Sequence, residues 1–384
     1  MESKTQERGS VVIILNPLNK QKRLEFDTKL KWIMQNLETF TCKWKEHIRK
    51  RPGMYIGDMH FTGFKHMLEY FFEEILEDCS ENLILKIDFF KGNTITIKLI
   101  NADTKKFLLR IEELQSTENK MQSLGIHILT TLSSDISIAI NDQPNLLVLY
   151  GQKGDFKIAA TTSQKKEKNI VITFTADKEI FKDFELVYEH INTFLRQFAL
   201  LNQNLKIIST DKTTNELQRN IFCYPTGIFK QLDYLISQHP YCLSSLRIDI
   251  DAEIDNYIYK IGISYVNIWC DMPLIKTYAG NIETPLGGSL NEGILNGLIL
   301  SIKKIAQKES IEIVINRKLV KKQLVLIAVV KGKNFQFKGS TKTKLGMPKV
   351  KKDVTQLVYE HMKNHFDTNK NTTSYILNKF KKWE

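Results

Sequence analysis

The sequence predicts an α+β protein of two domains, each with helices packed against a mostly antiparallel or mixed sheet. Its 384 residues are more than one ordinary hydrophobic core organises. Short apolar runs typical of strands are separated by turns rich in Asn, Gly and Lys, and longer amphipathic stretches lie between them. With 42% hydrophobic and 26% charged residues, the composition is that of a folded globular protein.

Residues 1–42 are expected to form an N-terminal arm. They contain a short strand-like run at 11–15, followed by a Lys-rich stretch whose apolar residues between 26 and 37 have helical spacing. The sequence Arg51-Pro52-Gly53 then ends any helix, because proline disfavours the helical conformation of the residue before it.

The first domain is assigned to residues 43–235. A helix is expected from Thr62-Gly63 onward, because apolar residues recur there every three or four positions. Those residues are Phe64, Met67, Leu68, Phe71, Phe72, Ile75 and Leu76. Further helices are predicted at 125–132 and 181–202. Strands are predicted at 83–89, 94–100, 136–140, 146–150, 156–161 and 170–174.

The second domain is assigned to residues 236–384. A Gly-rich turn, Gly287-Gly288-Ser289, precedes a helix expected at 290–307, and a second helix is expected at 350–366. Strands are predicted at 246–250, 257–268, 311–316 and 324–331. This order of elements is typical of a small α+β domain in which a helix makes the crossover between strands.

Positive charge is concentrated at the C-terminal end of the chain. Residues 301–384 contain 20 Lys and Arg against six Asp and Glu, whereas residues 1–300 contain 35 against 37. No acidic residue occurs between Glu312 and Asp353. This concentration favours a surface that faces a polyanion, and a solvated lysine-rich face is the alternative.

The sequence excludes several other classes of protein. No apolar stretch reaches the roughly 20 residues that a membrane span needs, and no secretory signal is recognisable at the N-terminus. The cysteines show no C-x-x-C spacing, which argues against a zinc site or a disulfide scaffold and favours a reducing cytoplasm. They are Cys42, Cys79, Cys223, Cys242 and Cys270.

Four blocks of sequence, in order along the chain, resemble one protein family. Residues 49–57 read RKRPGMYIG and are followed by TGFKHM. A second block begins with EIF at residues 179–181 and ends with LRQFALLN at residues 195–202. Residues 278–282 read YAGNI, with a GGS turn after them, and residues 340–346 read STKTKLG. These blocks are similar to those of the ATPase and transducer region of gyrase B and topoisomerase IV B. The resemblance implies a gyrase/chaperone/kinase/MutL-type (GHKL-type) ATPase sandwich, followed by a transducer domain.

The resemblance also implies where a nucleotide site should lie. At most of these positions the residue type in this sequence differs from that of the family. Tyr70 stands where the family has the carboxylate that activates water, and Glu74 stands where it has the Mg²⁺-binding Asn. Ala102 replaces the Asp that reads adenine, and only Gly125 remains of a phosphate-binding loop. Lys342 matches the lysine that reaches the γ-phosphate. Tyr70 is unsuited to be a general base, because a phenol has a reference pKa near 10.

Two acidic residues next to the matched positions could take over functions that this nucleotide site has lost. Asp103 is one residue from the adenine-reading position, and it could act as a register-shifted substitute. Glu69 is one residue from the base position, but one residue corresponds to about 100° around a helix. No residue is therefore assigned as catalytic, and no metal ligand is assigned.

The sequence thus predicts a gyrase-B-like protein that neither hydrolyses nor tightly binds ATP, and no cofactor is expected. It would act in the cytoplasm through its basic transducer domain. This domain would bind the DNA backbone without reading the base sequence, or it would bind a topoisomerase A or B subunit. The predicted DNA contacts are Lys303, Lys304, Arg317, Lys318, Lys321, Lys322, Lys344, Lys349, Lys351 and Lys352.

Three further points are left open by the sequence. The alternative function is the ATP-hydrolysing N-terminal half of a divergent type II topoisomerase, with ATP and Mg²⁺ as its cofactors. A weaker alternative is a pocket that holds another, apolar ligand near Phe71, Phe72 and Phe107. A homodimer would have to rest on permanent contacts made by residues 1–40, since no nucleotide would close it.

Overall fold

The chain divides into two units in the computed structural model. It describes residues 39–42, 44–78, 82–114, 124–142, 145–162, 167–182, 184–237, 244–266, 273–339 and 342–382. The N-terminal unit comprises residues 1–197 and 204–223, and the C-terminal unit comprises residues 198–203 and 224–384. The arm predicted for residues 1–42 lies outside the described residues, apart from 39–42, and so does the homodimer contact predicted for it.

The N-terminal unit is built on a nine-stranded sheet within the described residues, in the order β1-β6-β5-β4-β7-β3-β2-β8-β9. The strands are β1 (Thr39–Thr41), β2 (Leu83–Phe90), β3 (Thr94–Ile100), β4 (Ser133–Asn141), β5 (Asn145–Gln152), β6 (Asp155–Thr162), β7 (Asn169–Ala176), β8 (Leu205–Asp211) and β9 (Gln218–Cys223). Neighbouring strands are antiparallel except for β2 and β8, which are parallel. The predicted mixed sheet and its six predicted strands are therefore confirmed.

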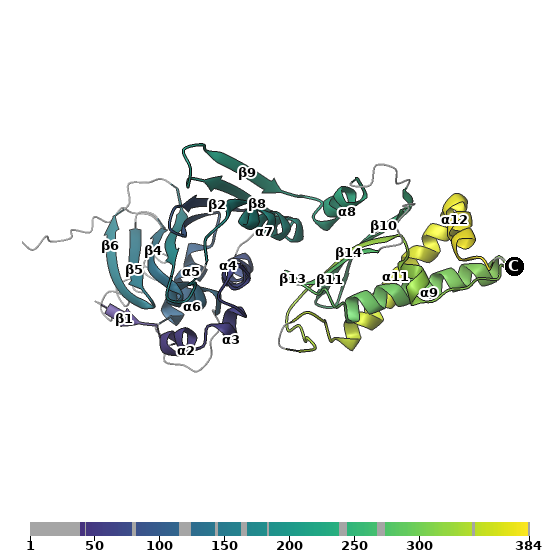
Figure 1. Ribbon diagram of the computed structural model, residues 1–384, viewed down its shortest axis with the longest axis horizontal. Helices are drawn as coiled ribbons and strands as arrows, with labels where there is room; N and C mark the ends of the chain where they lie inside the picture. The colour runs from purple at the N-terminus through teal and green to yellow at the C-terminus, as the bar shows by residue number, and fades with distance from the viewer. Residues whose placement is uncertain are drawn as a thin grey trace, which may run out of the picture. The chain divides into compact units, whose positions relative to one another are not determined.

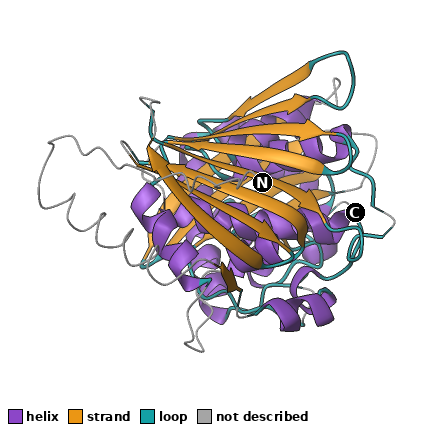
Figure 2. Ribbon diagram, turned by 90° about the vertical axis from the view of Figure 1, so that its left-hand side faces the viewer, coloured by secondary structure: helices purple, strands orange, loops and turns teal. Residues whose placement is uncertain are grey.

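Helices cover one face of this sheet (Figures 1 and 2). They are α2 (Lys45–Lys50), α3 (Gly53–Ile56), α4 (Phe61–Asp78), α5 (Thr104–Glu113), α6 (Leu124–Thr131) and α7 (Tyr188–Leu201). On α4 the predicted apolar stripe is buried from Phe64 to Ile75, so this amphipathic helix packs as its spacing predicts.

One predicted helix begins later than expected. Residues 181–182 and 184–187 are not helical, and α7 starts only at Tyr188. The side chain of Asn93 holds this segment in an irregular conformation, because its amide donates to the Phe184 carbonyl (2.8 Å) and accepts the N–H of Leu186 (2.9 Å). The ring of Phe184 stacks on Phe64, so the first part of the predicted helix is an irregular segment packed into the core.

The C-terminal unit contains a five-stranded sheet, in the order β10-β11-β14-β12-β13, among the residues that the structure describes. The strands are β10 (Ser244–Ile254), β11 (Tyr257–Val266), β12 (Leu274–Ala279), β13 (Ile282–Glu283) and β14 (Leu324–Lys331). The helices are α8 (Ile228–Ser237), α9 (Ser289–Lys308), α10 (Arg317–Lys321), α11 (Pro348–Thr368) and α12 (Lys370–Phe380). The parallel strands β12 and β14 are joined through α9, which confirms the predicted crossover helix.

The strand expected at residues 311–316 needs correction, and the two units divide at a different point from the expected domain boundary. Residues 311–316 form no strand, because only Ile313 makes a bridge, to Lys381, and no neighbouring strand continues the ladder. The boundary between the units lies at Cys223/Tyr224, earlier than the domain boundary expected after residue 235. The reason is that α8 packs against β11 and β14, where Leu232 joins a buried cluster with Val325 and Ile327.

Candidate nucleotide site and basic surface

Three of the residues predicted for a nucleotide site lie together where α4 meets α6. Tyr70 and Glu74 are one helical turn apart on α4, and Gly125 lies at the amino end of α6. A Cβ atom on Gly125 would lie 2.5 Å from the Tyr70 carbonyl oxygen and 2.7 Å from the Cα of Phe71. The two helices therefore approach backbone to backbone, and glycine is required at this position.

The carboxylate of Glu74 is buried, with 7% of the residue exposed, and it is bonded within the protein. Its Oε2 accepts the backbone N–H of Ile126 at 3.1 Å, and its Oε1 lies 2.9 Å from Nη1 of Arg110 on α5. The same guanidinium donates from Nη2 to the backbone carbonyl of Glu74, at 3.1 Å. Burial raises the pKa of Glu74 to about 7, opposed by the charge of Arg110 and by the N–H groups of Ile126 and Gly125.

The stretch that matches the adenine-binding turn begins a helix that the sequence reasoning did not predict. Asp103 caps α5, because its Oδ1 accepts the backbone N–H groups of Lys105 (3.0 Å) and Lys106 (3.1 Å). The next residue, Thr104, donates from Oγ1 to the buried Asp142 at 2.9 Å. A capping signal was present in the sequence, since Asp103 precedes apolar residues with helical spacing.

Lys342, the remaining predicted site residue, belongs to the C-terminal unit. It lies in the segment before α11 with φ of +55°, a left-handed conformation that non-glycine residues seldom adopt. The next residue holds this segment in place, because the Thr343 carbonyl accepts the N–H of Leu286 at 3.1 Å.

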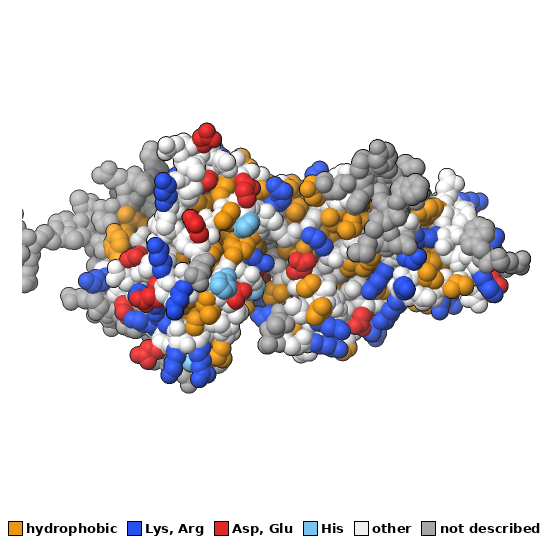
Figure 3. Space-filling model, in the orientation of Figure 1, with side chains coloured by type: hydrophobic (Ala, Val, Ile, Leu, Met, Phe, Trp, Pro, Cys, Tyr) orange, Lys and Arg blue, Asp and Glu red, His pale blue; other side chains and the backbone are white. Residues whose placement is uncertain are grey.

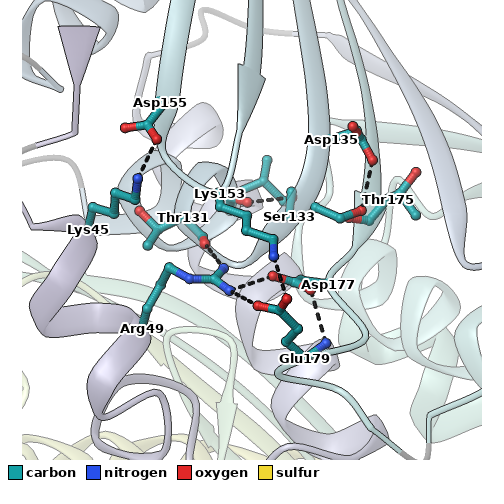
Figure 4. Close-up of polar contacts among 12 residues, drawn as sticks. Lys45, Arg49, Thr131, Ser133, Asp135, Lys153, Asp155, Thr175, Asp177 and Glu179 are labelled. Carbon is teal, nitrogen blue, oxygen red and sulfur yellow. Dashed lines mark hydrogen bonds and ion pairs between the residues drawn. The ribbon is translucent and has the colours of Figure 1, made fainter.

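A partly buried ion-pair cluster joins two of the sequence blocks, and the sequence reasoning gave it no role (Figure 4). Arg49, on α2, places Nη2 2.7 Å from Asp177 and 3.0 Å from Glu179, and Nη1 donates to the Thr131 carbonyl at 2.9 Å. Lys153 also pairs with Glu179, at 2.6 Å. The Arg49 block and the Glu179 block therefore meet in space, and this contact anchors α2 to the ends of α6 and β7.

The predicted DNA contacts all lie in the C-terminal unit, and they differ in exposure. Lys321, Lys322, Lys344 and Lys351 are half-buried. The exposed ones are Lys303, Lys304, Arg317, Lys318, Lys349 and Lys352. Figure 3 shows Lys and Arg side chains gathered along the edge of this unit near α9 and α11.

Two of these lysines are paired with acidic residues, one of which is four positions away and two of which are far away in the sequence. Lys349 pairs with Asp255 (2.5 Å) and Asp353 (3.2 Å), and Lys351 pairs with Glu292 at 2.9 Å. The hydrogen bond from Lys351 lowers the pKa of Glu292. Such pairs offer less net charge to a polyanion than lysines without an acidic partner.

A second group lies on α9 and α10, which contact each other. Nη2 of Arg317 donates to Oδ1 of Asn296 at 2.9 Å, and Lys303 is two helical turns beyond Asn296 on the same side of α9. Lys304 and Lys318 are the exposed neighbours of Lys303 and Arg317. We call these four residues, Lys303, Lys304, Arg317 and Lys318, the α9–α10 basic group.

The chain is similar in sequence to B subunits of DNA gyrase and type 2 topoisomerase. Residues 227–384 match the family model of DNA gyrase B. The chain is 25% identical over 379 residues to the DNA gyrase B subunit of Borreliella burgdorferi, covering 91% of this chain and 59% of that protein. It is 22% identical to the type 2 topoisomerase B subunit of Aquifex aeolicus, covering 87% of this chain and 45% of the relative. The chain thus spans about half the length of these relatives.

Solved structures show the same fold. The B subunit of the Myxococcus xanthus gyrase superposes with a TM-score of 0.74 at 18% identity, covering 87% of this chain and 99% of that one. The 43K ATPase domain of Thermus thermophilus gyrase B, solved with an aminocoumarin, gives a TM-score of 0.72 at 18% identity. The match covers 88% of this chain and 94% of that one.

The fold is therefore the GHKL-type α+β sandwich followed by a small α+β domain, as predicted. The chain is related to the N-terminal region of the gyrase and topoisomerase IV B subunits, and the resemblance stated from its sequence is confirmed. Nowhere in the described ranges does a helix combine the length and the apolar run that crossing a bilayer requires.

Proposed function

We propose that this gyrase-B-like chain neither hydrolyses nor tightly binds ATP, and that it acts by binding DNA through its basic C-terminal unit. One observation carries the first part. Two carboxylates at or beside the matched positions are engaged within the chain, Glu74 by Arg110 and Ile126, and Asp103 by the first N–H groups of α5. The buried Glu74 cannot reach a ligand without breaking its contacts, and Oδ1 of the exposed Asp103 is committed to the helix cap.

The chemistry of the remaining positions supports the same proposal. Tyr70 offers a phenol where the family has a water-activating carboxylate, and a phenol is a poorly matched general base at neutral pH. Glu74 puts a carboxylate where the family has an amide that holds Mg²⁺, so its charge would oppose a polyphosphate. The residues present therefore do not fit Mg²⁺-ATP, and we assign no step that uses it.

DNA binding is supported by the α9–α10 basic group. Its four side chains are exposed, and they lie on two helices in contact. Lysine and arginine bind phosphate oxygens and so fix a protein on a duplex without reading its bases. We therefore propose backbone binding that is independent of sequence, either alone or beside a topoisomerase partner. We also propose that the protein acts in the cytoplasm, with DNA as its ligand.

The salt dependence of duplex binding tests this proposal. Each phosphate contact contributes about 0.9 to the slope of log K against log salt concentration. The double variant Lys303→Gln/Lys304→Gln should therefore bind more weakly at low salt, with a slope smaller by about 2. Fluorescence anisotropy of a labelled duplex, titrated at several salt concentrations, measures both quantities.

The matched control removes two adjacent exposed lysines from the N-terminal unit. Lys105→Gln/Lys106→Gln makes the same change in net charge on another helix, and it should leave the slope unchanged. Wild-type protein that fails to bind duplex DNA at low salt would exclude the DNA-binding part of the proposal. Equal losses in the two double variants would show that only the net charge of the chain matters.

A further inference from the structure

The sheet of the N-terminal unit carries a cavity of about 940 Å³, lined by residues of β4, β5, β6 and β7. The cavity lies on the face opposite the helices, because the lining residues Asp135 and Ser137 alternate along β4 with buried residues. Figure 2 shows the sheet from this side, with helices behind it. A volume of this size is typical of a binding site.

The strand register explains why this face is hollow. Ser137 on β4 is paired with Tyr150 on β5 and with Thr173 on β7. Tyr150 is 58% exposed, whereas the hydroxyl side chains of Ser137 and Thr173 beside it are short, so the surface drops next to the ring. Two positions along the same face, Val148 pairs with Ala139, so apolar surface adjoins the cavity.

The chain enters the sheet at the rim of this cavity. β1 is the strand next to β6, and its first residue, Thr39, is opposite Lys157, which lines the cavity. Thr41 is opposite Asp155, a second lining residue. The residues before Thr39 are therefore tethered beside the cavity, and a short tether gives an effective concentration on the order of millimolar.

Residues 26–37, which lie outside the described residues, have a sequence that fits this face. Apolar residues recur there every three or four positions, so a helix over this segment would be apolar along one side. They are Phe26, Leu30, Ile33 and Leu37. A helix of this length is about 18 Å long, and the four strands under the cavity span about 14 Å. The segment is therefore long enough to cross them.

The charges of the segment and the cavity are complementary. The carboxylate of Asp135 accepts the Gln152 amide at 2.9 Å and the Ser134 hydroxyl at 3.0 Å, and neither of these neutral groups cancels its charge. Lys29 and Lys31 flank the apolar side of the segment, one on each side of Leu30. A helix with its apolar side on the cavity would bring an ammonium group towards this carboxylate.

We propose that residues 26–37 dock as an amphipathic helix in the cavity on the open face of the chain's own sheet. In this arrangement their apolar side packs against Tyr150 and the short side chains beside it, and the sheet gains a layer on its second face. The docked segment is then not available for contact with a second copy of the chain. This contact is independent of the proposed function, since it involves neither the nucleotide site nor the basic C-terminal unit.

Amide hydrogen exchange of the full chain tests this proposal. The amides of residues 26–37 should exchange about 10-fold or more slowly than those of a free peptide with the same sequence, because docking protects them. Ser137→Arg places a long charged side chain in the cavity and should return the exchange to the rate of the peptide. Lys86→Arg puts an arginine on the same face of the sheet, on β2 and outside the cavity, and should leave the protection unchanged.

A second pair of variants changes the segment and leaves the sheet as it is, so it decides the question even if Ser137→Arg fails to fold. Leu30→Asp puts a charge on the apolar side of the segment and should release it from the cavity. The exposed amine of Lys157 should then be acylated faster by a water-soluble reagent. Thr28→Asp adds the same charge on the opposite side of the helix and should leave the rate of acylation unchanged.

Several results would overturn the proposal. Exchange of residues 26–37 at the peptide rate in the wild type would show that the segment is not docked. Protection that survives in folded Ser137→Arg, or equal acylation of Lys157 in Leu30→Asp and Thr28→Asp, would place the segment elsewhere. Protection that is lost on dilution would show that the segment binds a second copy of the chain instead of its own sheet.

Discussion

At the scale of single residues, buried charges hold the N-terminal unit together. Asp177 is 2% exposed and meets Arg49 at 2.7 Å, so each charge depends on the other for its solvation. Glu74 and Arg110 form a second such pair between α4 and α5. In both cases an arginine from one helix neutralises an acid that lies in another segment of the fold.

Replacing Arg49 with methionine should destabilise the unit strongly. The Arg49→Met variant leaves Asp177 buried beside an apolar side chain, and breaking a buried pair in this way costs about 3–5 kcal/mol. Urea unfolding followed by circular dichroism measures the loss. Arg51→Met removes a nearby exposed arginine and should change the stability little, so equal losses in the two variants would refute this reading of the cluster.

The residue types at the candidate site could be read from the sequence, but their partners could not. The motif register identified Tyr70, Glu74 and Gly125, and the structure brings these three residues together. The pairing of Glu74 with Arg110 could not be predicted, because it depends on α5, which the sequence reasoning had assigned to the remains of a nucleotide-binding turn.

At the scale of elements, the contact between α4 and α6 depends on a single glycine. Gly125→Ala would put a methyl group 2.5 Å from the Tyr70 carbonyl and 2.7 Å from the Cα of Phe71, and helix backbones cannot move aside cheaply. Overpacking of this kind costs about 1–3 kcal/mol. Thermal unfolding of the variant should therefore begin at a lower temperature than that of the wild type.

Gly53→Ala is the matched control for this substitution. No atom lies within 4 Å of the position that its Cβ would occupy, and the residue starts the short helix α3. Its stability should be unchanged or slightly raised, since alanine favours helix formation. If Gly125→Ala were as stable as Gly53→Ala, the close approach of α4 and α6 would be wrong.

Secondary structure was predictable wherever a periodic apolar pattern matched a single element. β3 and β14 have the predicted bounds, because each is a continuous apolar or alternating run that turn residues delimit. Residues 181–187 were included in a helix predicted to extend to residue 202, but the side chain of Asn93 holds the backbone at Phe184 and Leu186 in another conformation. That bond joins residues distant in sequence, so no local pattern could reveal it.

At the scale of the whole molecule, the uneven distribution of charge was visible in the sequence, but the availability of each charge was not. The concentration of lysine after residue 300 predicted a basic C-terminal unit. The structure then separates Lys349 and Lys351, which pair with acids from other elements, from the α9–α10 basic group. Asp255 and Glu292 reach these lysines only through the tertiary fold, which is why composition could not rank them.

The central claim is that a gyrase-B-like fold is kept here without a working nucleotide site. Calorimetric titration of the wild-type chain with a non-hydrolysable ATP analogue and Mg²⁺ tests that claim most directly. The account predicts only the heat of dilution, with and without duplex DNA. Saturable, Mg²⁺-dependent binding that is lost in Lys342→Ala would contradict it and would favour an ATP-hydrolysing topoisomerase half.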